Sequence, residues 1–163
     1  MTKVDMEKAA LCEFLEYQRA SVRAILADLD LASLRKPVLP SGWSPLGLVE
    51  HLGHAERHWF QEVFRGSVEP LPWPDENTPL RTTRSPSQVF GFYRDQCDVS
   101  DGIIAAAPLT AAPAGRHLDE TLASQTTDLR RIVLHVIEET ARHAGHLDVV
   151  RELIDGRTGL GPR

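Results

Sequence analysis

Apolar residues recur at steps of three and four positions along four stretches of the chain, a spacing typical of α-helices with one buried face. The stretches cover about 5–30, 45–65, 86–106 and 128–154. The first contains one polar interruption, at Gln18. The positions predicted to face a core are Leu11, Phe14, Leu15, Gln18, Val22, Ile25, Leu26 and Leu29; Leu48, Leu52, Ala55, Trp59 and Val63; Val89, Phe92, Tyr93, Gln96, Val99, Ile103 and Ile104; and Leu129, Ile132, Val133, Val136, Ile137, Thr140, Ala144, Leu147, Val150, Leu153 and Ile154.

Capping residues sharpen the predicted helix ends. Ser44–Pro45 and Ser85–Pro86 each combine an N-cap side chain with a proline that fits the first helical turn. Gly66 and Gly156 are predicted stops for the second and fourth helices. Residues 67–84 contain four prolines and are predicted as loop. Residues 107–127 are also predicted as loop, with one short helix around 118–123.

These elements predict an all-α fold, because no run of alternating polar and apolar residues is long enough for a strand. A chain of 163 residues is long enough for one core, so residues 1–163 are predicted to form a single domain. Four long helices favour a four-helix bundle. The connection of about 19 residues after the second helix, at roughly 3.3 Å per residue, can span a whole helix of about 30 Å. It therefore permits parallel second and third helices joined by a long crossover.

Composition excludes several classes of partner. No apolar run reaches the roughly 18–20 residues of a membrane span, and the first residues lack the apolar stretch of a signal peptide, so a cytoplasmic location without membrane contact is expected. The net charge of −5 argues against a nucleic-acid partner. Cys12 and Cys97 are too few for a disulfide framework, and their helical setting favours small buried residues over nucleophiles.

Histidine is the conspicuous residue type. Six of the seven histidines fall in two windows, one on the second helix and one on the fourth: His51, His54 and His58, and His135, His143 and His146. His135, Glu139 and His143 follow one another at steps of four, so they share one helix face. Imidazole nitrogen and carboxylate oxygen are ligands that divalent metals accept when no thiolate is present. One helix cannot complete the coordination, and His51 offers a third ligand from the second helix. The alternatives are incidental histidines in a structural bundle and a pH-sensitive pair of imidazoles.

The segments WSPLGLVEHLGHAERHWF and HVIEETARHAGHLDVVRELIDG resemble the DinB-like superfamily of small metalloproteins, in particular its mini-DinB branch. The superfamily also contains mycothiol-dependent maleylpyruvate isomerase and the bacillithiol and mycothiol S-transferases. The resemblance implies a DinB-like bundle with His51, Glu139 and His143 as metal ligands. Most members carry histidine where this chain has Glu139, and the mycothiol-dependent isomerase branch carries glutamate there. His135 and His146 lie on the same stripe and are alternative ligands or close neighbours of the ligands.

Three protein ligands leave open positions for substrate, as catalytic metal sites do. The resemblance implies a divalent ion, with zinc expected and nickel or iron as alternatives. It also implies a metal-dependent transferase or isomerase that activates a low-molecular-weight thiol, mycothiol or bacillithiol, for a small-molecule substrate. A homodimer is expected on the same ground. A metal-binding or stress-linked binding protein without turnover is the alternative function. No motif specifies the substrate or a catalytic residue.

Other polar and aromatic residues near the windows are weaker candidates. Glu50 and Glu138 each neighbour a ligand in sequence, but a one-residue step turns them about 100° away, so both are expected to be exposed. Arg142 is expected to be a solvated surface residue rather than an anion-binding one. Trp73, in the proline-rich loop, is a candidate cover for the mouth of the site.

Overall fold

The structure is a computed structural model that describes residues 3–67 and 78–160. Within these ranges every regular element is helical, so the predicted all-α class is confirmed. The elements are α1 (Lys3–Leu26), α2 (Leu31–Arg35), α3 (Pro45–Glu56), the π-helical segment η1 (Arg57–Phe64), α4 (Pro86–Ala106), α5 (Glu120–Gln125) and α6 (Leu129–Asp155). No helix of the described ranges is both long and apolar enough to cross a bilayer. The single domain, the homodimer and the cytoplasmic location stay predictions.

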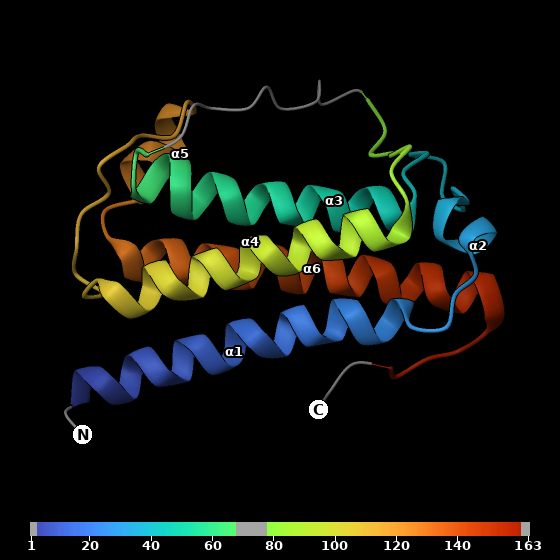
Figure 1. The fold of residues 1–163 in the computed structure, drawn as a ribbon, viewed down its shortest axis with the longest axis horizontal. Coiled ribbons are helices and arrows are strands. Elements are labelled where there is room, and N and C mark those ends of the chain that lie inside the picture. The colour runs from blue at the N-terminus through green and yellow to red at the C-terminus, as the bar shows by residue number, and fades with distance from the viewer. Residues whose placement is uncertain (1–2, 68–77, 161–163) are drawn as a thin grey trace.

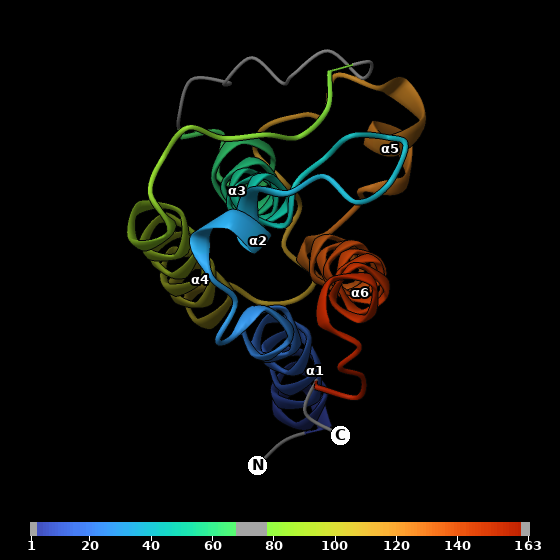
Figure 2. The same ribbon diagram turned by 90° about the vertical axis from the view of Figure 1, so that its right-hand side faces the viewer.

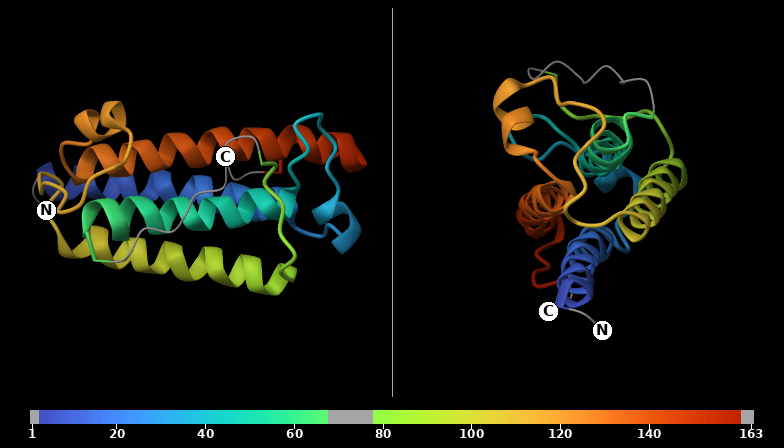
Figure 3. Two further views of the ribbon diagram at one scale, coloured as in Figure 1. Left: turned by 90° about the horizontal axis from the view of Figure 1, so that it is seen from above. Right: turned by 90° about the vertical axis from the view of Figure 1, so that its left-hand side faces the viewer.

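The long helices lie side by side along one direction (Figure 1). Seen end-on, they surround a common centre, with α1 beside α6, α3 beside α4, and α1 across the centre from α3 (Figure 2). The colour gradient shows α3 and α4 running in the same direction, opposite to α1 and α6 (Figures 1 and 3). This is the parallel course that the long second connection permits. The short helices α2 and α5 lie at opposite ends of the molecule (Figure 1).

Local capping decides where the helices begin, as the sequence predicts. The Ser44 side chain accepts a hydrogen bond from the backbone N–H of Gly47, and Ser85 forms a capping box with Gln88. Asp128 caps α6 in the same way, and Gly156 ends that helix with a left-handed φ of 75°.

The predicted end of the first helix was wrong. It ends at Leu26 rather than near residue 30, because Asp28 adopts a left-handed φ of 64° and breaks the helical course. Asp30 then caps α2, which the sequence analysis did not predict, by accepting from the Ser33 backbone N–H at 2.7 Å. The predicted short helix at 118–123 occurs two residues later, since Asp119 is its N-cap.

Most predicted core positions are buried, but Phe14, Val99 and Leu153 are exposed. On α1 the buried stripe is rotated away from Phe14, whose side chain is 57% exposed. The stripe passes instead through Leu15, Arg19 and Val22. A search for apolar periodicity passes over Arg19 because its side chain is charged.

Arg19 joins α1 to α3 through the centre of the bundle. Its Nε and Nη2 atoms donate to the two carboxylate oxygens of Glu56 at 2.7 and 2.9 Å, and its Nη1 donates to Asp101 on α4 at 2.7 Å. The side chains of Arg19 and Glu56 are each 1% exposed. One apolar cluster precedes this ion pair along α3 and α4, and a second follows it.

The helix that contains Glu56 changes its winding immediately after that residue. A uniform helix to about residue 65 was predicted, but residues Arg57–Phe64 form a π-helical segment. The N–H of Arg65 bonds to the carbonyl of Phe60, five residues earlier, at 3.1 Å. The wider turn changes which side chains of this segment face α6.

Candidate metal centre

Two neighbouring helices place three candidate ligands together. His51 lies in α3, and Glu139 and His143 lie on successive turns of α6. The Nε2 atoms of His51 and His143 lie 3.3 and 2.9 Å from Oε1 of Glu139. One ligand atom from each residue lies within 4.8 Å of the others. The structure thus brings together the three residues that the resemblance implies as ligands; their binding of an ion stays a prediction.

The three side chains lie at the edge of the buried helix faces. Leu52 follows His51 directly on α3, and Leu147 lies one turn after His143 on α6; both leucines are buried in the same apolar cluster. The side chains of His51, Glu139 and His143 are 19, 21 and 15% exposed. The core therefore fixes the helix positions while the polar atoms remain within reach of a small molecule.

The two imidazoles act directly on the carboxylate between them. Hydrogen bonds from His143 and then His51 hold the pKa of Glu139 well below its ordinary value, against the opposing effect of burial. Glu139 is therefore a carboxylate at neutral pH. A charged oxygen between two imidazole nitrogens is a donor set that suits a first-row divalent cation.

His146 and His135 lie outside this group of three. Nδ1 of His146 lies 3.3 Å from Nδ1 of His143, on the exposed side of that ring. The ring of His135 packs against Trp59, with centroids 4.4 Å apart. The ring of His146 thus contacts the candidate ligand His143, whereas the ring of His135 contacts Trp59 of η1.

A cavity of about 190 Å³ opens directly beside His51. Its wall depends on a close approach between α3 and the segment before α4. A Cβ atom on Gly47 would lie 2.2 Å from the carbonyl oxygen of Leu80, so only glycine fits this position. The cavity is lined by Gly47, Glu50, His51, His54, Thr78, Pro79, Leu80 and Arg81.

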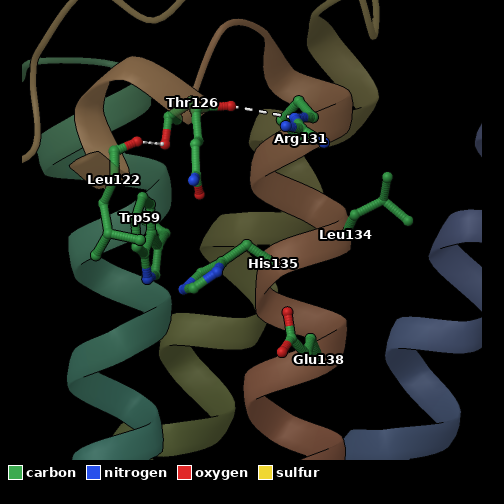
Figure 4. Close-up of a pocket in the computed structure, with 8 residues that line it drawn as sticks. Trp59, Leu122, Thr126, Arg131, Leu134, His135 and Glu138 are labelled. Atoms are coloured by element: carbon green, nitrogen blue, oxygen red, sulfur yellow. Dashed lines mark hydrogen bonds between the residues drawn. The ribbon is translucent and has the colours of Figure 1, made fainter.

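A second cavity, of about 170 Å³, lies where η1, α5 and α6 come together (Figure 4). Trp59 and His135, whose ring centroids lie 4.4 Å apart, both line it. It is lined by Trp59, Leu122, Gln125, Thr126, Arg131, Leu134, His135 and Glu138. None of the three candidate ligands lines this cavity, although Glu138, which directly precedes Glu139, does.

The family model of the mycothiol S-transferases matches residues 10–156. The chain belongs to the mycothiol S-transferase family. This confirms the predicted DinB-like membership, since the family is part of that superfamily. No curated protein and no solved structure matched the chain significantly.

The cysteines of this family member are poorly placed as nucleophiles. Cys97 is buried and Cys12 is half-buried. Burial raises the pKa of both thiols, so the thiolate form is disfavoured at neutral pH. A reactive thiol in this protein is therefore expected to come from a bound small molecule.

The acidic neighbours of the ligands differ in their surroundings. Glu138 is exposed and accepts a hydrogen bond from Arg142 at 2.9 Å, as expected for two surface residues. Glu50 was predicted to be exposed, but it is half-buried because Arg84, before α4, donates to it at 3.0 Å. Trp73, the candidate cover of the site, lies outside the described residues.

The packing of His117 against aromatic rings of η1 was not predicted from the sequence. This residue comes from the segment before α5, which was predicted as loop. Its ring stacks on Trp59, with centroids 5.0 Å apart and an interplanar angle of 16°, and lies 5.0 Å from the ring of His58. His58 itself is buried and pairs with Glu62 at 2.7 Å. A single histidine in a loop without periodicity gives no signal of such stacking.

Proposed function

We propose that His51, Glu139 and His143 hold one divalent metal ion, zinc in the first place, and that the protein uses it to activate the thiol of mycothiol, which loses its proton and adds through its sulfur to an electrophilic small molecule. The observation that carries this proposal is the convergence of the three ligand atoms within 4.8 Å in a chain of the mycothiol S-transferase family. A divalent cation in such a site lowers the pKa of a neighbouring thiol and so supplies a thiolate near neutral pH.

The residues of the chain have distinct tasks in this proposal. Glu139 supplies negative charge, and the two Nε2 atoms face it from both sides. His146 orients His143, because the Nδ1–H of a ligating imidazole needs an acceptor and Nδ1 of His146 lies 3.3 Å away. The cavity beside His51 leaves room for a substrate next to the ligands.

Metal content tests the ligand assignment. Protein purified without a histidine tag is expected to contain about one divalent ion per chain, and His51→Ala and Glu139→Gln to lose it. His146→Ala is expected to weaken metal binding by only about 10- to 100-fold, since it removes a partner of a ligand rather than a ligand. The matched control is His54→Ala, one turn along α3, which is expected to retain the ion. Equal metal content in wild type, His51→Ala and His54→Ala would refute the site.

Thiol consumption tests the activity. Wild-type protein is expected to conjugate mycothiol to a reactive electrophile faster than His143→Ala does, with bacillithiol and glutathione as comparison thiols. A protein that holds the metal yet consumes no thiol above the His143→Ala background would instead support the alternative of metal binding without turnover.

A further inference from the structure

The cavity beside His51 contains three ionisable side chains besides that candidate ligand. They are Glu50 and His54 of α3, and Arg81 of the segment before α4. The proposed reaction needs a place for the electrophile next to the ligands, and this cavity of about 190 Å³ has room for a small molecule. A few polar groups on the wall of such a cavity decide which molecules it accepts.

Arg81 is held in place by the backbone beside it. Its Nε donates a hydrogen bond to the carbonyl oxygen of Gly42 at 2.8 Å. The segment that contains Arg81 is tied to the start of α3, since the N–H of Ser44 donates to the carbonyl oxygen of Leu80 at 2.9 Å. Within residues 3–67 and 78–160, no acceptor bonds to either Nη atom of Arg81. A guanidinium held in this way keeps N–H groups for a further partner, in the planar geometry that matches a carboxylate.

The other ionisable groups of the cavity do not cancel the charge of Arg81. Glu50 already has a partner, because Nη1 of Arg84 donates to its Oε1 at 3.0 Å. The guanidinium of Arg84 also lies over the ring of Phe92, 5.2 Å from its centroid. Burial lowers the pKa of His54, so its imidazole is uncharged at neutral pH. The wall therefore has an excess positive charge at Arg81, which attracts an anion.

Most of the remaining wall is apolar. Pro79 and Leu80 line the cavity together with Gly47, and Thr78 adds one hydroxyl group. Apolar surface of this kind favours the hydrocarbon part of an organic acid over a fully hydrated ion such as inorganic phosphate.

We propose that the cavity beside His51 binds a small organic acid, with its carboxylate on Arg81 and its apolar body against Pro79 and Leu80. The proposal rests on the proposed function and names the class of electrophile, one that carries a carboxylate. Because His51 lines the same cavity, an acid held by Arg81 has its other atoms beside the candidate ligands. Arg81 then determines specificity, since a neutral electrophile of the same shape gains nothing from its charge.

Calorimetric titration of the protein as purified with benzoate tests this assignment, because benzoate has a carboxylate and an apolar ring but no electrophilic leaving group. Benzamide, which has a similar shape without the charge, is the comparison ligand. Wild type is expected to bind benzoate about tenfold more tightly than benzamide. Arg81→Gln is expected to lose this preference and to bind benzamide as wild type does. Arg81→Lys keeps the charge but not the planar group, so an intermediate preference is expected.

The matched control is Arg94→Gln, which removes the same charge from an exposed position of α4 outside the wall of this cavity. It is expected to keep the preference for benzoate. The same preference in wild type and Arg81→Gln would overturn the proposal. An equal loss in Arg94→Gln would also overturn it, because net charge would then explain the effect. Inorganic phosphate that binds as tightly as benzoate would contradict the choice of an organic acid.

The variant His51→Ala separates this proposal from the proposed function. Benzoate binding that depends on Arg81 both in wild type and in His51→Ala supports the acid site, even if the protein holds no metal and consumes no thiol. Benzoate binding that is lost in His51→Ala but unchanged in Arg81→Gln would assign the carboxylate to the metal centre, and the acid site would be refuted.

Discussion

Replacing Glu56 by glutamine is expected to destabilise the protein far more than an ordinary polar substitution. Burial opposes the charge of Arg19, but Glu56 beside it outweighs that effect and holds the pKa of Arg19 above its ordinary value. Arg19 stays charged in Glu56→Gln, because a guanidinium is not deprotonated in proteins, and it loses the carboxylate that compensates it. Removing one partner of a buried ion pair costs about 3–5 kcal/mol. We expect about 3 kcal/mol, at the lower limit, because Asp101 still faces Arg19 at 2.7 Å, although its side chain is 56% exposed.

Urea unfolding followed by circular dichroism measures this loss as a lower midpoint. The control Glu152→Gln changes an exposed carboxylate on α6 and is expected to remain within about 0.5 kcal/mol of wild type. The double variant Arg19→Met/Glu56→Met removes both charges and is expected to be more stable than Glu56→Gln, because no buried charge is left without a partner. A loss below about 1 kcal/mol in Glu56→Gln, or a double variant less stable than the single one, would refute the account of the ion pair.

Three further predictions concern other parts of the chain. Gly47→Ala places a Cβ 2.2 Å from the Leu80 carbonyl oxygen and is expected to destabilise the protein by about 1–3 kcal/mol, measured as a lower melting temperature. Gly145→Ala, where nothing lies within 4 Å of the added Cβ, is expected to raise the melting temperature. Burial lowers the pKa of His58 despite Glu62 beside it, so the unfolded chain takes up this proton first as pH falls below about 6.5. Stability in urea is expected to fall with pH below that value and to fall less in His58→Gln. Burial also raises the pKa of Cys97, so its alkylation is expected only under denaturing conditions, and rapid labelling of the native protein would contradict this.

Helix starts could be predicted because their signals are local. Ser44, Ser85 and Asp128 each act on a backbone N–H three residues ahead, so a few letters of sequence contain the whole interaction. Arg19 could not be placed in the same way. Its burial depends on Glu56, 37 positions away. A charged residue within an apolar stripe is predicted to be exposed to solvent unless its ion-pair partner is known.

The candidate site likewise combines features set by local sequence with features set by contacts between distant segments. Helical spacing alone puts Glu139 and His143 on one face, and the resemblance adds His51 from the other window. The 3.3 Å distance between His51 and Glu139 depends on how α3 packs against α6, which no local pattern encodes. The stacking of His117 on Trp59 depends on the course of a connection without periodicity, so this contact could not be predicted.

The change of helix type after Glu56 determines the direction in which Trp59 points relative to His51. Trp59 follows His51 by eight residues, and in a regular α-helix this step turns a side chain about 80° away from the first. A π-helical turn closes hydrogen bonds over five residues rather than four, so each residue turns through a smaller angle. The π-helical segment that begins at Arg57 therefore rotates Trp59 back towards the face of His51, where it meets His135 on α6. No glycine or proline occurs between Glu56 and Phe64 to signal this change in the sequence. His51 and Trp59 thus both meet α6 because the helix that contains them changes its winding between them.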